Sequence, residues 1–411
     1  MGGDSSGHEE PTRRDYVKYG GALVGGGLLA GCTGGSGSEP SSESGDNETG
    51  GGTSDDGSYT VELFPVGEVE FEEVPETWTA LTTDGWSDMA VALGQAEGCR
   101  TPNVRLALYH DALDVEVNTD WPAFWEESGG SWAIPKETFY EIDADLHLID
   151  PNRLKNSDDH WNDADIEEVE SRVGPFFCCY NRRTTTDWQR DLDYPEKAPS
   201  MLEAFERLGD VFQEQERAEA LLDVHDEMQA ALDDRMDGVE PASIGLVNGG
   251  SEPEKGAFYP LDLSDPGYEM KTYRDLGVED AFADLHDGEY GGEIDYEGLL
   301  EYDPTVLVVH WGIINTEDGR FDPDAFHEQY VAPMEEHEVG SELTAVQEGS
   351  VYPGAYGEQG PIANLFQTEL TGQQLYPERF GEFDPQAYPE VPEEYRLFDR
   401  EEVAAIVNGD R

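Results

Sequence analysis

The chain has 411 residues, and its 92 acidic against 24 basic residues give a formal net charge of −68 at pH 7. So negative a surface repels the phosphates of nucleic acids and of anionic membranes, which excludes both as partners. Hydrophobic residues make up 37% of the chain and aromatic residues 10%, enough to build a core, so wholesale disorder is excluded as well.

The acidic residues run along the whole chain, and Arg outnumbers Lys by 18 to 6 among the basic ones. Dense carboxylates repel one another in dilute buffer, but in molar salt the Debye length falls to about 3 Å and the repulsion is screened. The composition therefore indicates adaptation to high salt, and single carboxylates are not taken as catalytic groups.

Residues 1–31 resemble a twin-arginine (Tat) export signal. Arg13 and Arg14 precede an apolar stretch of about 11 residues, too short to span a bilayer core of about 30 Å. The stretch ends in Leu-Ala-Gly before Cys32, which resembles a lipoprotein cleavage box. We expect cleavage before Cys32, lipidation of its thiol, and an extracytoplasmic protein held at the outer face of the cell membrane by this lipid alone.

Residues 33–58 are Gly, Ser, Thr, Asn and acidic residues with a single Pro, a composition that cannot form a core. With Cys32 they form a lipidated, flexible, acidic tether over residues 32–58. The patterns below divide the rest into an N-terminal α/β lobe (59–199), a connecting helix (200–237) and a C-terminal α/β lobe (238–411).

Short apolar runs predict the strands of both lobes, at 78–82, 104–108, 145–149, 176–177, 243–247, 305–309 and 351–352. A helix should follow the first strand up to Gly94, and another should start at Gly360-Pro361 after the last.

The two lobes share a repeated segment. Residues 137–150 align without a gap on residues 297–310: each has Glu first, Glu four residues on, Asp two after that, and then an apolar run. Each predicts a short helix, a turn and a buried strand, which is the second half of a βαβ crossover. We therefore expect two lobes with mainly parallel sheets.

Apolar residues recur at helical spacing from Ser200 to Met236, which predicts one long helix as a rigid strut between the lobes. Two helices broken between Gln213 and Glu216 are the alternative. The overall fold class is thus α/β, with two lobes joined by a long helical strut.

Cys99, Cys178 and Cys179 remain after Cys32, an odd number for an exported protein. One disulfide between Cys99 and a member of the pair is favoured, although the spacing does not say which. A metal site at these thiols is not expected, since no C-x-x-C motif occurs.

This order of elements resembles the class III substrate-binding proteins of ABC importers, in a haloarchaeal-like version, from about Val66 to Phe383. That family serves ferric siderophores, haem, cobalamin and some bare metal ions. The resemblance implies capture of a small-molecule metal chelate, most simply an Fe(III)-siderophore of the iron-hydroxamate type. The chelate would be delivered to a permease with a separate ATPase. No intrinsic cofactor and no enzymatic activity are implied.

The same resemblance implies that one acidic residue of each lobe docks on permease arginines, at the start of the helix before the aligned strand. Those positions are Glu137 and Glu297. A duplicated charge suits a two-fold permease. In so acidic a chain, two surface glutamates without a role are an equally good interpretation.

Ligands of open α/β sheets bind beyond the carboxyl ends of the strands. A bulky anionic chelate needs arginine for charge and flat rings for packing. The residues of these types at predicted strand ends are Trp86, Tyr109, Arg182, Arg183, Trp311 and Tyr356. The stretch from Trp121 to Trp132 could cap the cleft.

Other ligands and roles stay open. His110 and His310 could bind zinc or manganese with Asp84 or Asp150 as oxygen ligands. A haem or cobalamin ligand would need a single axial His or Tyr. A surface adhesion role and an exported enzyme are further alternatives, but neither G-x-S-x-G nor H-E-x-x-H occurs in the sequence.

Overall fold

The computed structural model describes residues 57–81, 83–101, 105–118, 134–157, 161–285 and 292–409. The predicted export signal, Cys32, the tether up to residue 56 and the stretch from Trp121 to Trp132 lie outside the described residues. None of the described helices is long and apolar enough to cross a membrane.

The first strands form an antiparallel hairpin that the sequence did not predict. Strand β1 (Tyr59–Leu63) pairs with β2 (Gly67–Phe71), and Tyr59, Val61 and Leu63 turn their side chains inward. The Tyr59 hydroxyl donates a hydrogen bond to the Val211 carbonyl of helix α9 (Met201–Phe212), which ties the hairpin to the connecting segment.

The N-terminal lobe is built on a short parallel sheet. Strand β3 (Trp78–Thr79) pairs with β4 (Leu146–His147), and single bridges add Cys99 beside β3 and Phe176 beside β4. Its helices are α1 (Asp84–Ala92), α2 (Ala107–Asp111), α4 (Lys136–Ile142), α5 (Pro151–Ser157), α6 (Asp163–Arg172), α7 (Asp187–Asp191) and α8 (Tyr194–Lys197).

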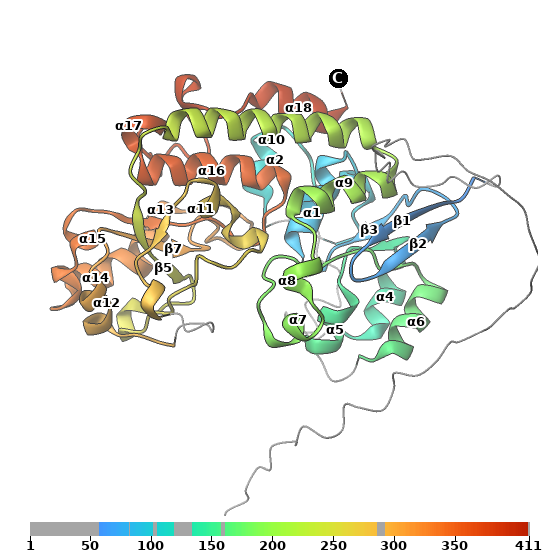
Figure 1. Ribbon diagram of the computed structural model, residues 1–411, viewed down its shortest axis with the longest axis horizontal. Helices are drawn as coiled ribbons and strands as arrows, with labels where there is room; N and C mark the ends of the chain where they lie inside the picture. The colour runs from blue at the N-terminus through green and yellow to red at the C-terminus, as the bar shows by residue number, and fades with distance from the viewer. Residues whose placement is uncertain are drawn as a thin grey trace, which may run out of the picture. The chain divides into compact units, whose positions relative to one another are not determined.

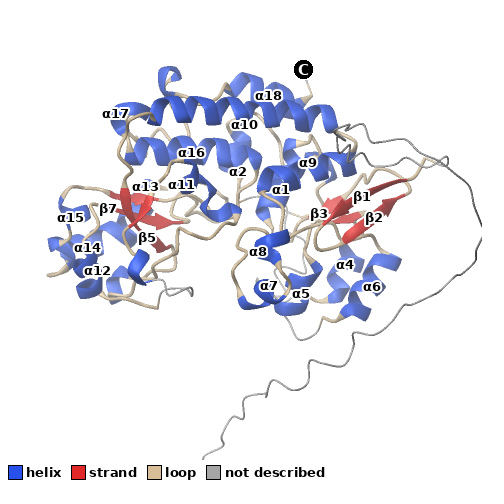
Figure 2. Ribbon diagram, viewed as in Figure 1, coloured by secondary structure: helices blue, strands red, loops and turns tan. Residues whose placement is uncertain are grey.

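The C-terminal lobe holds a parallel sheet of four strands in the order β6-β5-β7-β8. The strands are β5 (Ser243–Asn248), β6 (Glu279–Asp280), β7 (Val306–His310) and β8 (Val351–Pro353). Its shorter helices are η3 (Tyr268–Met270), α11 (Lys271–Asp275), α12 (Tyr296–Tyr302), α13 (Pro323–Phe326), α14 (Ala332–Glu336) and α15 (Thr344–Gln347). Figure 2 shows the strands of the two lobes as separate groups, with helices around each.

The predicted repeat is confirmed. Helices α4 and α12 both end at an Asp in the left-handed conformation, Asp143 (φ 50°) and Asp303 (φ 40°), and the chain then enters β4 and β7 respectively. The strand order is the same in both lobes, since Cys99, β3, β4 and Phe176 correspond to β6, β5, β7 and β8. Both sheets are therefore parallel, as expected.

The connecting segment differs from the prediction. It consists of two helices, α9 and α10 (Gln215–Met236), because Gln213 takes a left-handed conformation (φ 55°) that ends α9. The single helix predicted over 200–237 is therefore wrong, and the alternative with a break at Gln213 is correct. Helix α10 has 22 residues and a length of about 33 Å at 1.5 Å per residue, and it runs alongside α16 in Figure 1.

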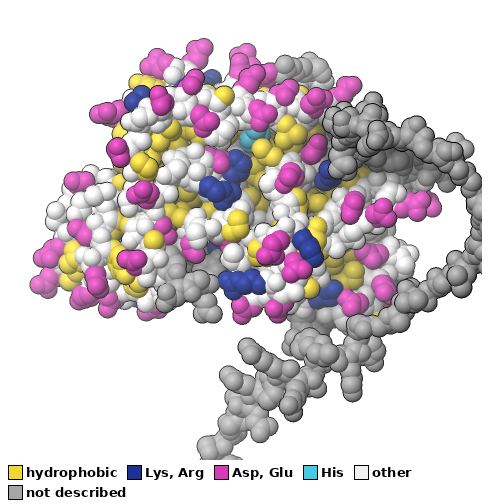
Figure 3. All heavy atoms as spheres, in the orientation of Figure 1, with side chains coloured by type: hydrophobic (Ala, Val, Ile, Leu, Met, Phe, Trp, Pro, Cys, Tyr) yellow, Lys and Arg dark blue, Asp and Glu magenta, His cyan; other side chains and the backbone are white. Residues whose placement is uncertain are grey.

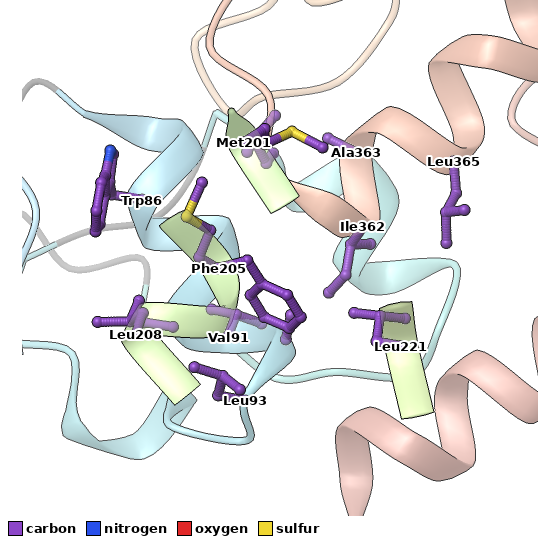
Figure 4. Close-up of a cluster of buried hydrophobic side chains, with 14 of the residues drawn as sticks. Trp86, Val91, Leu93, Met201, Phe205, Leu208, Leu221, Ile362, Ala363 and Leu365 are labelled. Atoms are coloured by element: carbon purple, nitrogen blue, oxygen red, sulfur yellow. The ribbon is translucent and has the colours of Figure 1, made fainter. Parts of the chain in front are cut away.

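Helix α16 (Pro361–Leu375) starts after Gly360, as predicted, and every residue except Leu375 is buried. It packs on α1, α9, α10 and α11, and the C-terminal helices α17 (Pro377–Phe380) and α18 (Arg400–Asn408) contact α16 and α10 respectively. Figure 4 shows side chains of α1, α9, α10 and α16 meeting in one apolar cluster. The core therefore joins the connecting helices to α1 of the N-terminal lobe and to α16 of the C-terminal lobe.

Two further predictions need correction. The strand expected at 104–108 is wrong, since α2 occupies residues 107–111, is mostly buried, and packs against α16. Cys99, Cys178 and Cys179 are all buried, unpaired thiols. No disulfide forms because Cys99 lies at the edge of the sheet beside β3, and its thiol donates to the Thr101 carbonyl instead.

Candidate functional site

A cavity of about 300 Å³ lies where strand ends of both lobes meet. It is lined by Asp84, Arg105, Arg153, Arg182, Trp311, Tyr356 and Glu358. In the N-terminal lobe the lining residues follow β3, Cys99, β4 and Phe176, and in the C-terminal lobe they follow β7 and β8. The cavity thus occupies the position where parallel α/β sheets bind ligands.

Arg182 is the central cation of this cavity. Its side chain is 14% exposed, with an Nη 3.1 Å from Oε1 of Glu358 and its Nε 3.7 Å from Oε2 of Glu269. The guanidinium also lies 5.1 Å from the ring centre of Trp311. Arg182 therefore connects the N-terminal lobe to two buried glutamates of the C-terminal lobe.

Trp311 forms an aromatic wall together with Tyr356, at a ring distance of 4.8 Å and an edge-on angle of 68°. Trp311 has a left-handed backbone (φ 75°), which is costly for a bulky residue and turns the chain sharply after β7. Its Nε1 donates to Glu269 at 3.1 Å. The strained turn thus holds the indole beside Arg182.

Arg105 and Asp84 of the N-terminal lobe form a hydrogen-bonded chain across the cavity with Tyr356 of the C-terminal lobe. The Tyr356 hydroxyl donates to Asp84 at 2.7 Å and accepts from Arg105 at 3.3 Å. The Arg105 side chain is 39% exposed, so this side of the cavity faces solvent.

Arg153 is held differently from the other two arginines. Its guanidinium lies 3.9 Å from the ring centre of Tyr180, and it makes no ion pair with any described residue. A guanidinium stacked in this way keeps its N–H donors available for a ligand.

The residues that line the cavity carry a net positive charge, although the protein as a whole is very acidic. Three arginines face two carboxyls, a formal balance of 3 − 2, or +1. Burial raises the pKa of Asp84 and of Glu358, which shifts the balance further toward positive charge. Figure 3 shows acidic side chains over most of this face and along its edge, with several basic side chains toward the middle.

Comparisons with known proteins bear on this arrangement. Residues 155–354 match a model of the periplasmic binding protein family. A periplasmic binding protein from Veillonella parvula is similar in structure, with 13% identity, coverage of 78% of this chain and 97% of that one, and a TM-score of 0.52. The TroA-like periplasmic binding protein FepB of Veillonella parvula has 15% identity, coverage of 82% and 97%, and a TM-score of 0.50. The chain has the periplasmic binding protein fold. Among curated proteins, none matches the sequence.

In this periplasmic binding protein fold, three of the six predicted ligand-binding residues line the cavity: Arg182, Trp311 and Tyr356. The other three do not. Arg183 pairs with Glu269 from outside the cavity, Trp86 is 1% exposed and donates to the Cys179 carbonyl, and Tyr109 is fully buried and stacked on Phe366. Trp86 and Tyr109 therefore belong to the core.

The predicted histidine pair does not come together. His110 bonds Asp88 at 2.7 Å, whereas His310 bonds Glu269 and Tyr273, each at 3.2 Å. Burial lowers the pKa of His310. No cluster of three or more His, Cys, Asp or Glu suited to a metal ion occurs within the described ranges. The binding of bare zinc or manganese by this pair thus has no structural support.

Three cavity residues were missed at the level of sequence. Arg153 directly follows the predicted strand-end residues Asp150 and Asn152, and a search one residue wider would have found it. Arg105 was hidden by the wrong strand at 104–108. Glu358 carries no sequence signal among so many carboxylates. Asp84 follows the first predicted strand, and the sequence offers it as a metal ligand.

Glu137 and Glu297 occupy equivalent places. Each is the second residue of its helix, α4 or α12, and each is exposed. The two glutamates therefore hold the same position in the repeated helices.

Proposed function

We propose that this protein is the extracytoplasmic substrate-binding component of an ABC importer and captures an anionic metal chelate, most simply a ferric siderophore. The observation that carries the proposal is the cavity with Arg105, Arg153 and Arg182 beside Trp311 and Tyr356, at the strand ends of both lobes. Arginines and flat rings suit a charged organic chelate better than a bare ion. The role is one of binding and delivery, without catalysis.

The size of the cavity refines the proposal. A volume of about 300 Å³ is at the lower end of ligand pockets, which span roughly 300–1,000 Å³. A siderophore would place its charged part among the arginines and extend past Arg105 to solvent.

Haem or cobalamin is the weaker candidate, because the only described Tyr on the cavity wall, Tyr356, already bonds Asp84 and Arg105.

Arg153 provides a direct test of the pocket. Titration of the purified protein in molar salt with ferric hydroxamate, ferric catecholate, haem, cobalamin and zinc should show saturable tryptophan quenching by a ferric chelate. Arg153→Gln should weaken that binding about tenfold to hundredfold, since charge-assisted hydrogen bonds contribute about 1.5–3 kcal/mol each. Arg190→Gln, which changes an exposed arginine of α7, should bind as the unaltered protein does. Equal affinity of the Arg153 and Arg190 variants would place the ligand elsewhere.

Delivery would use the lipid at Cys32, the tether, and docking of Glu137 and Glu297 on a permease that works with its own ATPase. Glu137→Lys combined with Glu297→Lys should abolish ligand uptake by cells and leave ligand affinity unchanged, because both residues lie outside the cavity. The matched control is Glu141→Lys with Glu301→Lys, exposed one turn further along the same helices. Uptake that survives the first pair, or fails equally with the second, contradicts the docking role.

A further inference from the structure

Glu358 places a negative charge inside the proposed ligand pocket. It is 3% exposed, and both carboxylate oxygens have partners: Oε1 is 3.1 Å from an Nη of Arg182, and Oε2 accepts from the Tyr268 hydroxyl at 2.6 Å. A carboxylate in this position occupies the same guanidinium that an anionic ligand would use. The protein's own side chain therefore competes with the cargo.

The guanidinium of Arg182 cannot neutralise both Glu358 and an anionic ligand. It also neutralises Glu269, although Glu269 has a second cation in Arg183, whose Nη donates to it at 2.8 Å. Burial alone would raise the pKa of Glu269, but Arg182, His310 and Arg183 together lower it, so Glu269 stays ionised. Among the residues that the structure describes, Glu358 has no such second cation in contact. When Arg182 turns to a ligand, Glu358 is the group that loses its counter-ion.

We propose that Glu358 is an internal counter-ion that an anionic ligand displaces from Arg182, and that Glu358 takes up one proton from solvent when this happens. The inference rests on the proposed function and adds a specificity-determining residue to it. It also names the ligand class, which is anionic: a neutral chelate would leave the Arg182–Glu358 pair intact and bind without proton uptake.

The surroundings of Glu358 decide the direction of the proton transfer. The charged and titratable groups that face it are Asp84 of α1, Arg105 before α2, Arg153 of α5, Cys178 and Arg182 of the loop after Phe176, and Tyr268 of η3. Burial already raises the pKa of Glu358 in the free pocket, with Arg182 and Arg153 opposing and Asp84 adding to the rise. A ligand anion that occupies the arginines raises the pKa further.

The consequence is a ligand affinity that depends on pH. Below the pKa of Glu358 in the free pocket, the carboxyl is already neutral and the affinity is constant. Above that pKa and up to the higher pKa in the complex, binding takes up one proton, and the dissociation constant rises by about tenfold per pH unit. Affinity therefore falls as the pH rises.

Citrate, a compact polyanion, is the probe for the test. Calorimetric titration of the full chain in molar salt, from about pH 5 to about pH 8 and in buffers of different ionisation enthalpy, should be compared with Glu358→Gln, because citrate itself titrates in this range. Relative to that variant, the unaltered protein should take up about one more proton on binding and lose affinity as the pH rises. Glu358→Gln should bind citrate more tightly than the unaltered protein at the upper end of this range, and its proton exchange should be that of citrate alone. The matched control is Glu369→Gln, a buried glutamate paired with Arg400 outside the pocket, which should keep the pH dependence.

Equal pH slopes for the unaltered protein and Glu358→Gln would overturn the inference, as would the absence of citrate binding to both. These results are distinct from failure of the proposed function. A neutral ferric hydroxamate that binds where citrate does not would keep the transport role and refute the Glu358 mechanism. Proton-coupled citrate binding without affinity for any metal chelate would keep the mechanism and refute chelate transport.

Discussion

Arg182→Met should lower both the stability of the protein and its affinity for ligand. Arg182 is 14% exposed and lies between Glu358 and Glu269, whose side chains are 5% and 0% exposed. Removal of one partner from a buried ion pair leaves an uncompensated charge and costs about 3–5 kcal/mol. Guanidinium chloride unfolding in molar salt should therefore show a reduced midpoint, and chelate titration should show no saturable binding at concentrations that saturate the unaltered protein.

The loss of stability in the Arg182→Met variant should also depend on pH. The lowered pKa of Glu269 means that its ionised form stabilises the native state above the unfolded pKa of about 4.3, and that this contribution is lost as the pH falls. Without Arg182 the pKa of Glu269 is lowered less. The stability difference between variant and unaltered protein should therefore be constant above about pH 4.3 and shrink only as the pH falls below that value.

Arg172→Met is the matched control for this variant. Arg172 is 64% exposed and pairs with Glu168 on the surface of α6, where such pairs contribute about 0–1 kcal/mol. Its unfolding midpoint should stay close to that of the unaltered protein at every pH. If the Arg182 variant matches the Arg172 variant, the buried cluster does not stabilise the fold as argued.

Asp88→Ala should destabilise the protein by a similar amount, about 3–5 kcal/mol, through a different mechanism. Asp88 on α1 is fully buried, and its carboxylate accepts from the backbone N–H groups of Ile362 and Ala363 at 2.9 and 3.0 Å and bonds His110 at 2.7 Å. Alanine would leave two N–H groups of the first turn of α16 and a buried imidazole without partners, and each such group costs about 1–3 kcal/mol.

Thermal unfolding measures this effect, and Ser87→Ala is the control. Ser87 is 4% exposed, and its Oγ has no hydrogen-bond partner in the part of the chain that the structure describes. Its removal should leave the melting temperature unchanged or slightly higher. Asp88→Asn, which keeps the shape and one acceptor oxygen, should lie between the two. A melting temperature of Asp88→Ala equal to that of Ser87→Ala would contradict the anchoring role of Asp88.

The fold could be predicted from the sequence wherever one local pattern determined a helix together with the turn and the strand that follow it. The Glu-x-x-x-Glu-x-Asp pattern before an apolar run correctly predicted α4–β4 and α12–β7, because an Asp accepts the left-handed turn that ends each helix. Gln213 adopts the same conformation without any such preference. The break between α9 and α10 could therefore be offered only as an alternative.

Three of the six predicted ligand-binding residues line the cavity, and the local backbone explains which ones. The rule that ligands lie beyond strand ends identified Arg182, Trp311 and Tyr356, since these residues sit in turns that open directly onto the cavity. It failed for Trp86 and Tyr109, which lie on helices, where rotation about the helix axis decides between core and cavity. That rotation is set by packing against α16, some 250 residues later in the chain, and no local pattern reports it.

The C-terminal segment completes the N-terminal lobe, and this has a consequence for the order of folding. Asn408 donates to the Leu113 carbonyl, Tyr388 donates to Tyr109, and the start of α16 is held by Asp88. A chain emerging from the ribosome makes its first lobe early, yet that lobe lacks these contacts until the final residues have been synthesised. Such distant pairings slow folding and expose apolar surface meanwhile. We therefore expect the nascent N-terminal half to remain open to chaperones and proteases until translation ends.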